Sequence, residues 1–361
     1  MEYIRAWAEV DTSRLINNVR AIKSVIPAKS SLMAVVKADA YGHGAHVLPR
    51  ILLENGADSL GVAICEEGVA LRESGITAPI LVMGYTPRPL LETAIDNNLI
   101  STVFSAESCA ALSKICAKQN KKAEVHIKID TGMSRLGIPL DCETSDTVCG
   151  ILRDPAFNVT GICTHFAASD DFMCEQYDRF MHFLGLLASR GVPVDQLVSH
   201  AGASGMLASG RDMYLDMVRI GIMLYGLSPI RPGLDIKPVM RLMSRVSMVK
   251  IVPPGTGISY NRLFTTSRES KIATISIGYA DGYSRALTNK GIVSIRGRKA
   301  PIVGAVCMDQ CMADVTDLPF DIPPGEPVVM FDDADAVASQ IGTIGYEVVC
   351  AVSKRVPRIY A

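Results

Sequence analysis

Residues 32–44 of the sequence read LMAVVKADAYGHG. The apolar run Leu32–Ala38 carries a single charge, Lys37, close to its end, and glycines follow at positions 42 and 44. Nearly continuous apolar runs are typical of parallel strands that are covered on both faces. This stretch therefore predicts a buried parallel strand that ends at a lysine and a glycine-bearing loop.

The same unit recurs through the first two-thirds of the chain, where short β-rich runs alternate with amphipathic helical patterns. The candidate strands are Leu32–Ala38, Leu60–Ile64, Pro79–Gly84, Ser101–Ser105, Glu124–Asp130, Val159–Phe166, Val198–Ser204 and Asp216–Gly221. Strands that each pair with a helix in this number predict a (β/α)8 barrel of TIM type. A doubly wound sheet fits the same alternation almost as well.

Two helical segments are marked most clearly. One follows Asp11, a good N-cap residue, and places Leu15, Val19, Ile22 and Ile26 on one face. The other runs from about Cys174 to Arg190, and we expect its inward residues to be Tyr177, Phe180, Met181, Leu184 and Leu187.

The sequence changes character after Leu227. The segment SPIRPGLDIKP is rich in proline and glycine and predicts a linker. Short strand-like runs follow it at Val246–Val252, Lys271–Gly278, Ile292–Ile295, Pro301–Cys307, Cys311–Val315 and Pro327–Phe331. We therefore expect a barrel domain over 1–230 and a smaller, mostly β C-terminal domain over 231–361, with residues 1–10 available to pair with the second domain.

Composition narrows the classes of function. Lys plus Arg (36) nearly balances Asp plus Glu (37), so a nucleic-acid partner has little support. Ten dispersed cysteines, without a Cys-x-x-Cys pair or an export signal, predict reduced and buried thiols in a cytoplasmic protein. No apolar run approaches the length of a membrane helix, so we expect no membrane contact. His43 and His46 have too few neighbouring ligand residues for a metal site, and we expect none.

Lys37 is the first candidate for chemistry. At the end of an apolar strand, burial lowers the pKa of a lysine and favours Schiff-base formation. A strand-end lysine that reaches solvent is the alternative. Tyr41, Gly42 and Gly44 follow in a loop that is suited to phosphate, although loose glycines alone are a weak signal.

The eighth predicted strand carries the second candidate. Arg219 lies within DMVRIGIMLYG, an apolar run where an unpaired guanidinium is very costly. It must meet an anion, a hydrogen-bond acceptor or a ligand, and a structural ion pair is the plainer possibility. Gly221 and Ile222 follow where barrel enzymes commonly bind phosphate, and the hydroxyl of Ser204 at the end of strand seven could join them.

Arg135 in KIDTGMSRLG follows strand five, and His165 in THFAASD follows strand six. Both could be surface loop residues. In a barrel, however, they share one rim with Lys37 and Arg219.

These motifs together resemble one family. AVVKADAYGHG is similar to the cofactor-lysine signature of alanine racemases, and further similarities follow in order through nearly the whole chain: KIDTGMSRLG, THFAASD, VRIGIMLYG, IGYADGYSR, VCMDQCMADVT and KRVPR. The resemblance implies a barrel that binds pyridoxal 5'-phosphate, a β-rich second domain and a head-to-tail homodimer. It also implies racemisation of a small amino acid, alanine, which supplies D-alanine for peptidoglycan.

The resemblance implies roles for the barrel residues. Lys37 corresponds to the lysine that holds the cofactor covalently, and Arg219 to the arginine that faces the pyridine nitrogen. His165 corresponds to the histidine beside Arg219, and Arg135 to the arginine that contacts the cofactor and the substrate carboxylate. The phosphate ligands correspond to Tyr41, Ser204, Gly221 and Ile222, and Lys128 corresponds to a position that is carbamylated in some members.

The second domain would supply residues to the partner's site. Tyr260, Met308 and Asp309 match residues that close the barrel mouth of the other subunit, and Tyr279 and Arg285 match an entrance corridor with Asp170 on the barrel side. Racemisation needs a base on each face of the substrate, and the resemblance assigns these roles to Lys37 and Tyr260. The reference pKa of tyrosine is about 10, so the implied help is a relay through His165 and Arg219.

Three positions depart from the family pattern. Ala203 replaces an asparagine, Asn261 replaces a common glycine, and Lys354 replaces a tyrosine on the phosphate side of the substrate pocket. A lysine could pair with phosphate as a point charge but would not form the same steric wall. A serine or broad-specificity racemase is therefore the nearest alternative. A fold-type III decarboxylase and a non-catalytic protein that binds pyridoxal phosphate are more distant ones.

Overall fold

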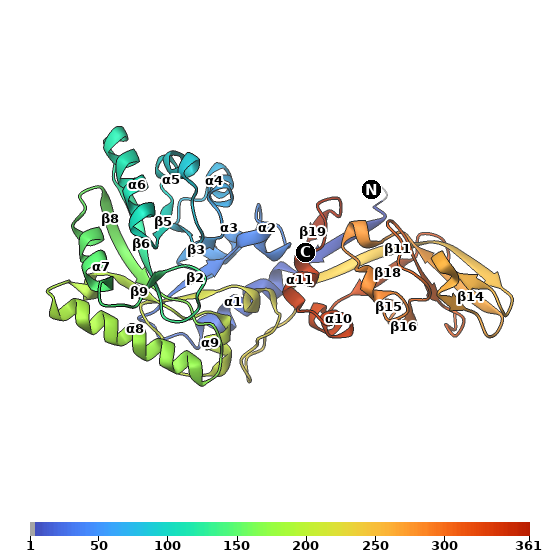
Figure 1. Ribbon diagram of the computed structural model, residues 1–361. Helices are drawn as coiled ribbons and strands as arrows, with labels where there is room; N and C mark the ends of the chain where they lie inside the picture. The colour runs from blue at the N-terminus through green and yellow to red at the C-terminus, as the bar shows by residue number, and fades with distance from the viewer. Residues whose placement is uncertain (1–3) are drawn as a thin grey trace.

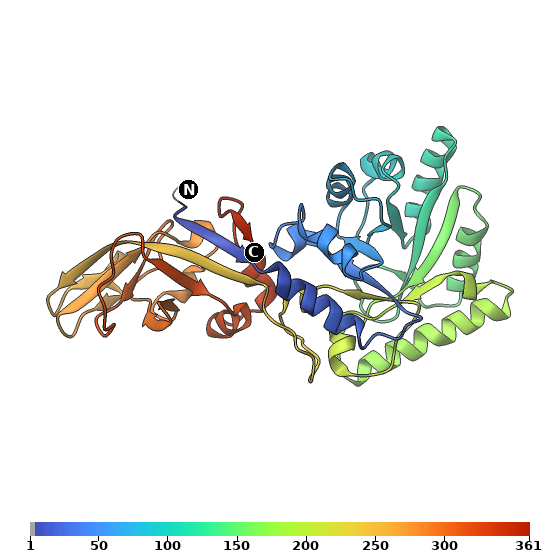
Figure 2. The ribbon, with the colours of Figure 1, turned by 180° about the vertical axis from the view of Figure 1, so that it is seen from behind.

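The computed structural model describes residues 4–361, which form a barrel and a second, mostly β region joined side by side (Figures 1 and 2). In the barrel, the parallel strands are β2 (Ser31–Val35), β3 (Ser59–Val62), β4 (Ile80–Val82), β5 (Ile100–Val103), β6 (Ala123–Asp130), β8 (Phe157–Cys163), β9 (Val198–His200) and β10 (Met217–Ile220). Pairing of β5 with β6 and of β10 with β2 closes the ring. This closure confirms the predicted barrel and excludes the doubly wound sheet.

Helices surround the ring. They are α1 (Thr12–Lys23), α2 (Lys37–Tyr41), α3 (Leu48–Glu54), α4 (Cys65–Glu73), α5 (Leu91–Asp96), α6 (Ala106–Gln119), α7 (Thr144–Arg153), α8 (Asp171–Ser189) and α9 (Ser204–Ser209). Asp11 caps α1 as predicted, because its side chain accepts a hydrogen bond from the amide of Arg14. In α8 the prediction that Met181 faces inward is wrong: it is 39% exposed, while Phe180, Phe183, Leu184 and Leu187 are buried.

The second region is built on one long strand, β11 (Met240–Val252), which pairs with β1 (Ala6–Val10), β14 (Ser270–Ile275) and β18 (Pro327–Phe331). The sheet is completed by β15 (Ile292–Ile295), β16 (Arg298–Pro301), β17 (Cys311–Asp314) and β19 (Arg358–Tyr360). The short strand β7 (Ile138–Pro139) extends the barrel sheet beside β6, and β12 (Gly257–Ile258) and β13 (Phe264–Thr265) form a separate two-stranded sheet. The helices α10 (Ala334–Ile341) and α11 (Gly345–Cys350) lie near the barrel (Figure 1). The region is mostly β, as predicted.

Several strand predictions are wrong in their extent: β8 and β9 end at Cys163 and His200 rather than at Phe166 and Ser204. The run Pro301–Cys307 contributes only Pro301 to β16 and an isolated bridge from Ile302, because the chain turns at Gly304, where φ is 76°. The first barrel strand ends at Val35 rather than Ala38, because the backbone leaves the extended conformation at Val36, where ψ is 18°, before the left-handed turn after Lys37.

All ten cysteines are free thiols, six of them buried, whereas Cys142 and Cys350 are exposed. None of the helices within residues 4–361 combines the length and apolar character that a membrane span requires.

Candidate active site

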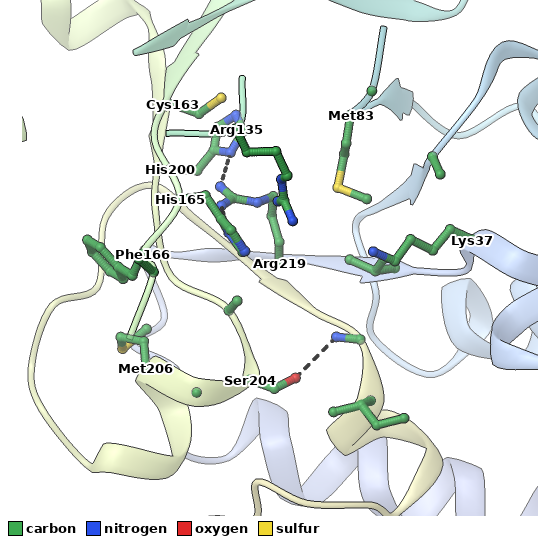
Figure 3. A pocket seen from close by; sticks show the side chains of 18 of the residues that line it. Lys37, Met83, Arg135, Cys163, His165, Phe166, His200, Ser204, Met206 and Arg219 are labelled. Carbon is green, nitrogen blue, oxygen red and sulfur yellow. Dashed lines mark hydrogen bonds between the residues drawn. The ribbon is translucent and has the colours of Figure 1, made fainter. Parts of the chain in front are cut away.

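The carboxyl ends of the barrel strands surround one cavity of about 620 Å³. Lys37 follows β2, His165 follows β8 and Arg219 lies on β10 (Figure 3). Lys128 lies on β6 and lines the same cavity. The cavity also contains Arg135, Ser204, Gly221, Ile222 and Tyr41. The structure thus brings together the barrel residues that the sequence singled out, at the end where barrel enzymes carry their sites.

Lys37 is followed by a turn of unusual handedness. Ala38, Asp39, Ala40 and Tyr41 have φ values of 51°, 55°, 53° and 53°. Each L-residue in this conformation costs roughly 1–2 kcal/mol, so the turn stores about 4–8 kcal/mol of strain. Strain of this kind persists only where surrounding groups enforce it, and it is concentrated at functional sites.

The Lys37 side chain enters the cavity, where burial and the charge of Arg135 lower the pKa of its amine and the Glu67 carboxylate opposes this shift. The lowered pKa leaves more of the amine unprotonated, which suits a nucleophile. Its Nζ lies 5.9 Å from the centre of the Tyr41 ring. The sequence prediction of a lysine in a largely apolar setting matches this environment.

A pocket for an anion lies beside Lys37. The Oγ of Ser204 is 3.3 Å from the amide nitrogen of Gly221 and 3.5 Å from that of Met223 (Figure 3 shows the first contact). A Cβ added at Gly221 would lie 3.0 Å from Cζ of Tyr41 and closer still to its hydroxyl, so glycine lets the phenol approach the backbone. A hydroxyl, a phenol and backbone amides are the donors that bind phosphate.

Tyr41 is held firmly in this pocket. Its ring packs at 5.1 Å from Tyr225 and 6.0 Å from Tyr346, centroid to centroid. Burial raises the pKa of the Tyr41 phenol, so the hydroxyl keeps its proton and can donate it to an anion.

Arg219 is 6% exposed and is satisfied by neutral acceptors. Its guanidinium donates to the carbonyls of Thr164 and Ala201, each at 2.9 Å. It also contacts Nδ1 of His200 at 2.5 Å and Nδ1 of His165 at 3.2 Å. A structural ion pair, the plainer reading of Arg219, is therefore absent among the salt bridges of residues 4–361, and the cation lies at the cavity wall (Figure 3).

The arginine fixes the protonation of two histidines behind it. Because a guanidinium can only donate, Nδ1 of His200 must be an acceptor, which leaves its proton on Nε2. That nitrogen lies 2.8 Å from Nδ1 of His126, to which it donates. Burial, then Arg219, lowers the pKa of His126 to about 4 and that of His165 to about 2. All three imidazoles are neutral at neutral pH.

Sequence reasoning missed His126 and His200. His126 had a detectable signal, because it stands two residues before Lys128 on the same strand and therefore faces the barrel interior with it. A Cβ at Gly161 would lie 2.7 Å from Nε2 of His126, so a glycine on the neighbouring strand makes room for the ring. Tyr346, on α11, was also missed.

Lys128 is 8% exposed, and burial lowers the pKa of its amine. It forms no salt bridge within residues 4–361 and lies among the charges of Arg219, Arg135 and Asp130. Arg135 is exposed at the cavity rim, and Asp170 is exposed at the N-cap of α8.

The single chain does not bring the second-domain residues to Lys37. Tyr260 is 70% exposed and Met308 53% exposed, and both line a separate cavity together with Asp309. Tyr279 is 42% exposed and Arg285 is exposed as well. Lys354 is exposed and lines a third cavity, which lies along Ala38 and Asp39.

Comparisons with known proteins cover the whole chain. Residues 10–229 match the family described as alanine racemase, N-terminal domain, and residues 239–360 match alanine racemase, C-terminal domain. An alanine racemase from Desulfovibrio desulfuricans is 43% identical over 366 residues, which span 98% of this chain and 97% of the relative. An alanine racemase from Methanococcus maripaludis is 42% identical, with 98% of each chain covered.

Solved structures agree over the same length. Alanine racemase from Clostridium difficile superposes with a TM-score of 0.95 at 35% identity, covering 100% of this chain and 97% of that one. Alanine racemase from Bartonella henselae, solved with covalently bound pyridoxal phosphate, superposes with a TM-score of 0.89 at 31% identity, covering 99% and 100%.

Proposed function

The chain belongs to the alanine racemase family, and from this we infer that it is a pyridoxal 5'-phosphate-dependent isomerase that interconverts L- and D-alanine. The observation that carries the inference is the match of both domains over nearly the full length. The cavity at Lys37 supplies a physical reason for it.

The residues of this cavity fit the cofactor. Lys37 offers a primary amine to the aldehyde, and Ser204, Tyr41 and the amide of Gly221 offer donors to the phosphate. A cavity of about 620 Å³ is within the usual range for small-molecule sites. When bound, pyridoxal phosphate supplies a conjugated system that withdraws electrons from the attached amino acid and acidifies its α-proton.

Arg219 would adjust that electron withdrawal. Its guanidinium keeps its proton at all physiological pH values, and the neutral imidazoles of His200 and His126 behind it have no extra proton to pass on. A ring nitrogen facing Arg219 would therefore stay unprotonated. This would weaken the electron withdrawal that the cofactor supplies and discourage side reactions such as transamination.

Lys37 would serve as the base on one face of the substrate, since burial and Arg135 lower the pKa of its amine. We propose that Tyr260 serves the other face and that Arg135 and Met308 contact the substrate. Tyr260 is 70% exposed and remote from the Lys37 cavity in one chain, so a second copy must deliver it.

A homodimer follows as a proposal. Ile64 and Tyr85 are 47% and 55% exposed and follow β3 and β4, at the carboxyl ends of the barrel strands. In the second domain, Leu263 and Met308 are 48% and 53% exposed near Tyr260. Docking the second domain of one copy onto the barrel mouth of another would cover both apolar groups and place Tyr260 beside the positive side chains of Arg219 and Arg135. Nearby cations lower the pKa of a phenol, which helps it act as a base.

Further proposals concern the surroundings of the site. Tyr279, Arg285 and Asp170 would form its entrance corridor in the dimer, and Lys128 would be carbamylated, which would give Arg135 an anionic partner. The division at residue 230, the cytoplasmic location and the delivery of D-alanine to peptidoglycan rest on the family, with ten free thiols as support for the location.

Serine as the substrate has no specific support. Lys354, the departure that suggested it, lines the cavity along Ala38 and Asp39 rather than the cavity of Lys37.

Attachment of the cofactor can be tested directly. Borohydride reduction of the purified protein followed by peptide mapping should place pyridoxal phosphate on Lys37, and the same sample should racemise L-alanine before reduction. A label on another lysine would overturn the assignment of Lys37, and absence of racemisation would overturn the activity.

A further inference from the structure

The left-handed turn Ala38–Tyr41 needs groups outside itself to hold it. Two side-chain anchors are Asp39, within the turn, and Arg358, from the C-terminal segment. The side chain of Asp39 accepts from the amide of Ala45 at 2.7 Å, and Nε of Arg358 donates to the carbonyl of Gly42 at 2.9 Å. These bonds tie the second residue of the turn to Ala45 and fix Gly42, the residue after the turn.

The near end is held by one side chain. The amide of Ala38, the first residue after Lys37, donates to Oε1 of Glu67 at 2.6 Å. Glu67 lies in the first turn of α4, which follows β3, and β3 is the immediate neighbour of β2 in the ring. The contact therefore ties the backbone directly after Lys37 to the next strand–helix unit.

The second oxygen of the same carboxylate is also used. Oε2 of Glu67 accepts from the amide of Ala63 at 2.8 Å and from that of Ile64 at 3.4 Å. All of these partners are donors, and they approach two different oxygens. Only an ionised carboxylate offers an acceptor on both sides, whereas a glutamine would turn its NH₂ group toward one set of N–H donors.

The same carboxylate also acts on Lys37 through its charge. Burial and Arg135 lower the pKa of the Lys37 amine, while Glu67 and, more weakly, Cys350 raise it. Glu67 thus has a backbone contact at the residue after Lys37 and an electrostatic effect on its amine.

We propose that Glu67 is a positioning residue, which locks the left-handed turn at Ala38 and thereby aims the Lys37 amine into the cavity. The proposal rests on the proposed function in one respect, namely that Lys37 is the residue that binds the cofactor. It adds a residue that touches neither cofactor nor substrate.

The test is hydrogen exchange of the purified, cofactor-bound protein, measured by mass spectrometry on peptides that cover residues 36–45 and, separately, helix α4. Variants Glu67→Gln and Glu67→Ala should exchange about tenfold to a hundredfold faster in 36–45, as expected for loss of a charge-assisted hydrogen bond. Glu66→Gln is the matched control, because Glu66 is the adjacent acidic residue on α4, is exposed and, like Glu67, lines the cavity along Ala38 and Asp39. It should exchange like the wild type.

A second readout separates positioning from helix capping. Uptake of pyridoxal phosphate by cofactor-stripped protein should follow the unprotonated Lys37 amine, so its acid limb should move to lower pH in both Glu67 variants and stay in place in Glu66→Gln. Wild-type exchange in 36–45 of Glu67→Gln would overturn the proposal. So would faster exchange that is equally large in α4 with an unmoved pH profile, since that is loss of a cap alone. Peptide mapping would show a cofactor attached to another lysine, which would contradict the proposed function. Hydrogen exchange in 36–45 would still test whether Glu67 holds the turn.

Discussion

Gly221→Ala probes the phosphate side of the cavity with a single methyl group. A Cβ at this position would lie 3.0 Å from Cζ of Tyr41, whereas ordinary van der Waals contact begins at 3.4 Å. The ring must therefore retreat by at least about 0.4 Å at Cζ and by more at its hydroxyl. Tyr225 and Tyr346 flank the ring, so the retreat is resisted, and overpacking of this kind costs about 1–3 kcal/mol.

The consequence should appear in cofactor affinity. A displaced phenol loses its hydrogen bond to the phosphate, and a bond to a charged group contributes about 1.5–3 kcal/mol. Titration of cofactor-stripped Gly221→Ala with pyridoxal phosphate should therefore give a Kd raised by about tenfold to a hundredfold. Gly221 has a φ of −115° and a ψ of −97°, a combination outside the main regions open to an L-residue, so alanine also adds backbone strain that removal of the Tyr41 hydroxyl does not relieve.

A double-substitution cycle makes the test specific. Adding Tyr41→Phe removes the hydroxyl that collides first, so the double variant should regain thermal stability relative to Gly221→Ala but not cofactor affinity. Wild-type affinity in Gly221→Ala would refute the reasoning, because it would show that the phenol does not bind the phosphate. Unchanged affinity and stability in both single variants would refute the contact itself.

Three further predictions follow from the same structure. Burial lowers the pKa of the imidazoles of His43, His126, His165 and His200, so below pH 6.5 the unfolded chain binds more protons than the folded protein. The free energy of unfolding should therefore fall by up to about 1.4 kcal/mol per histidine for each pH unit below 6.5, and urea unfolding at pH 7.5 and 5.5 would measure the loss. A flat profile would show that these rings take up protons as readily in the folded protein as in the unfolded chain. Gly150→Ala on helix α7 meets no atom within 4 Å and should raise the free energy of unfolding by about 0.5–1 kcal/mol; a loss of stability would contradict the helix. Lys354→Tyr should change the ratio of the kcat/KM values for serine and alanine by less than about twofold. Lys354 lines the cavity along Ala38 and Asp39, and a side chain distinguishes substrates that differ by one small group only if it contacts that group. A larger change would place residue 354 at the substrate.

The barrel was predictable because its strands are locally encoded. Each strand is a short apolar run flanked by turn residues, and the run around Ile127 matches β6 almost residue for residue. The end of β2 was not predictable by the same rule. Ala38 and Ala40 carry no local signal for a left-handed turn, and the contacts that anchor it, from Glu67 to Ala38 and from Arg358 to Gly42, come from distant parts of the chain.

The site was predictable to the extent that an unusual residue in an apolar strand signals itself. Lys37 and Arg219 both did so, and the structure places both at one cavity. His200 lies in a strand of only three residues, and its meaning depends on contacts with Arg219 and His126 that no local pattern contains. The role of Tyr260 also depends on contacts that no local pattern contains, because its proposed partner lies in another copy of the chain.

The most direct test of a site shared between two chains is to mix two inactive variants, Lys37→Ala and Tyr260→Phe, and measure alanine racemisation. In a head-to-tail dimer, each hybrid would contain one intact site and one doubly defective site. Random exchange between equal amounts of the two variants makes about half of the dimers hybrids, so about one quarter of the wild-type activity should return. Native mass spectrometry would count the hybrids in the same sample. Activity that rises in proportion to the hybrid fraction is the predicted result, and hybrids without activity would contradict the shared site.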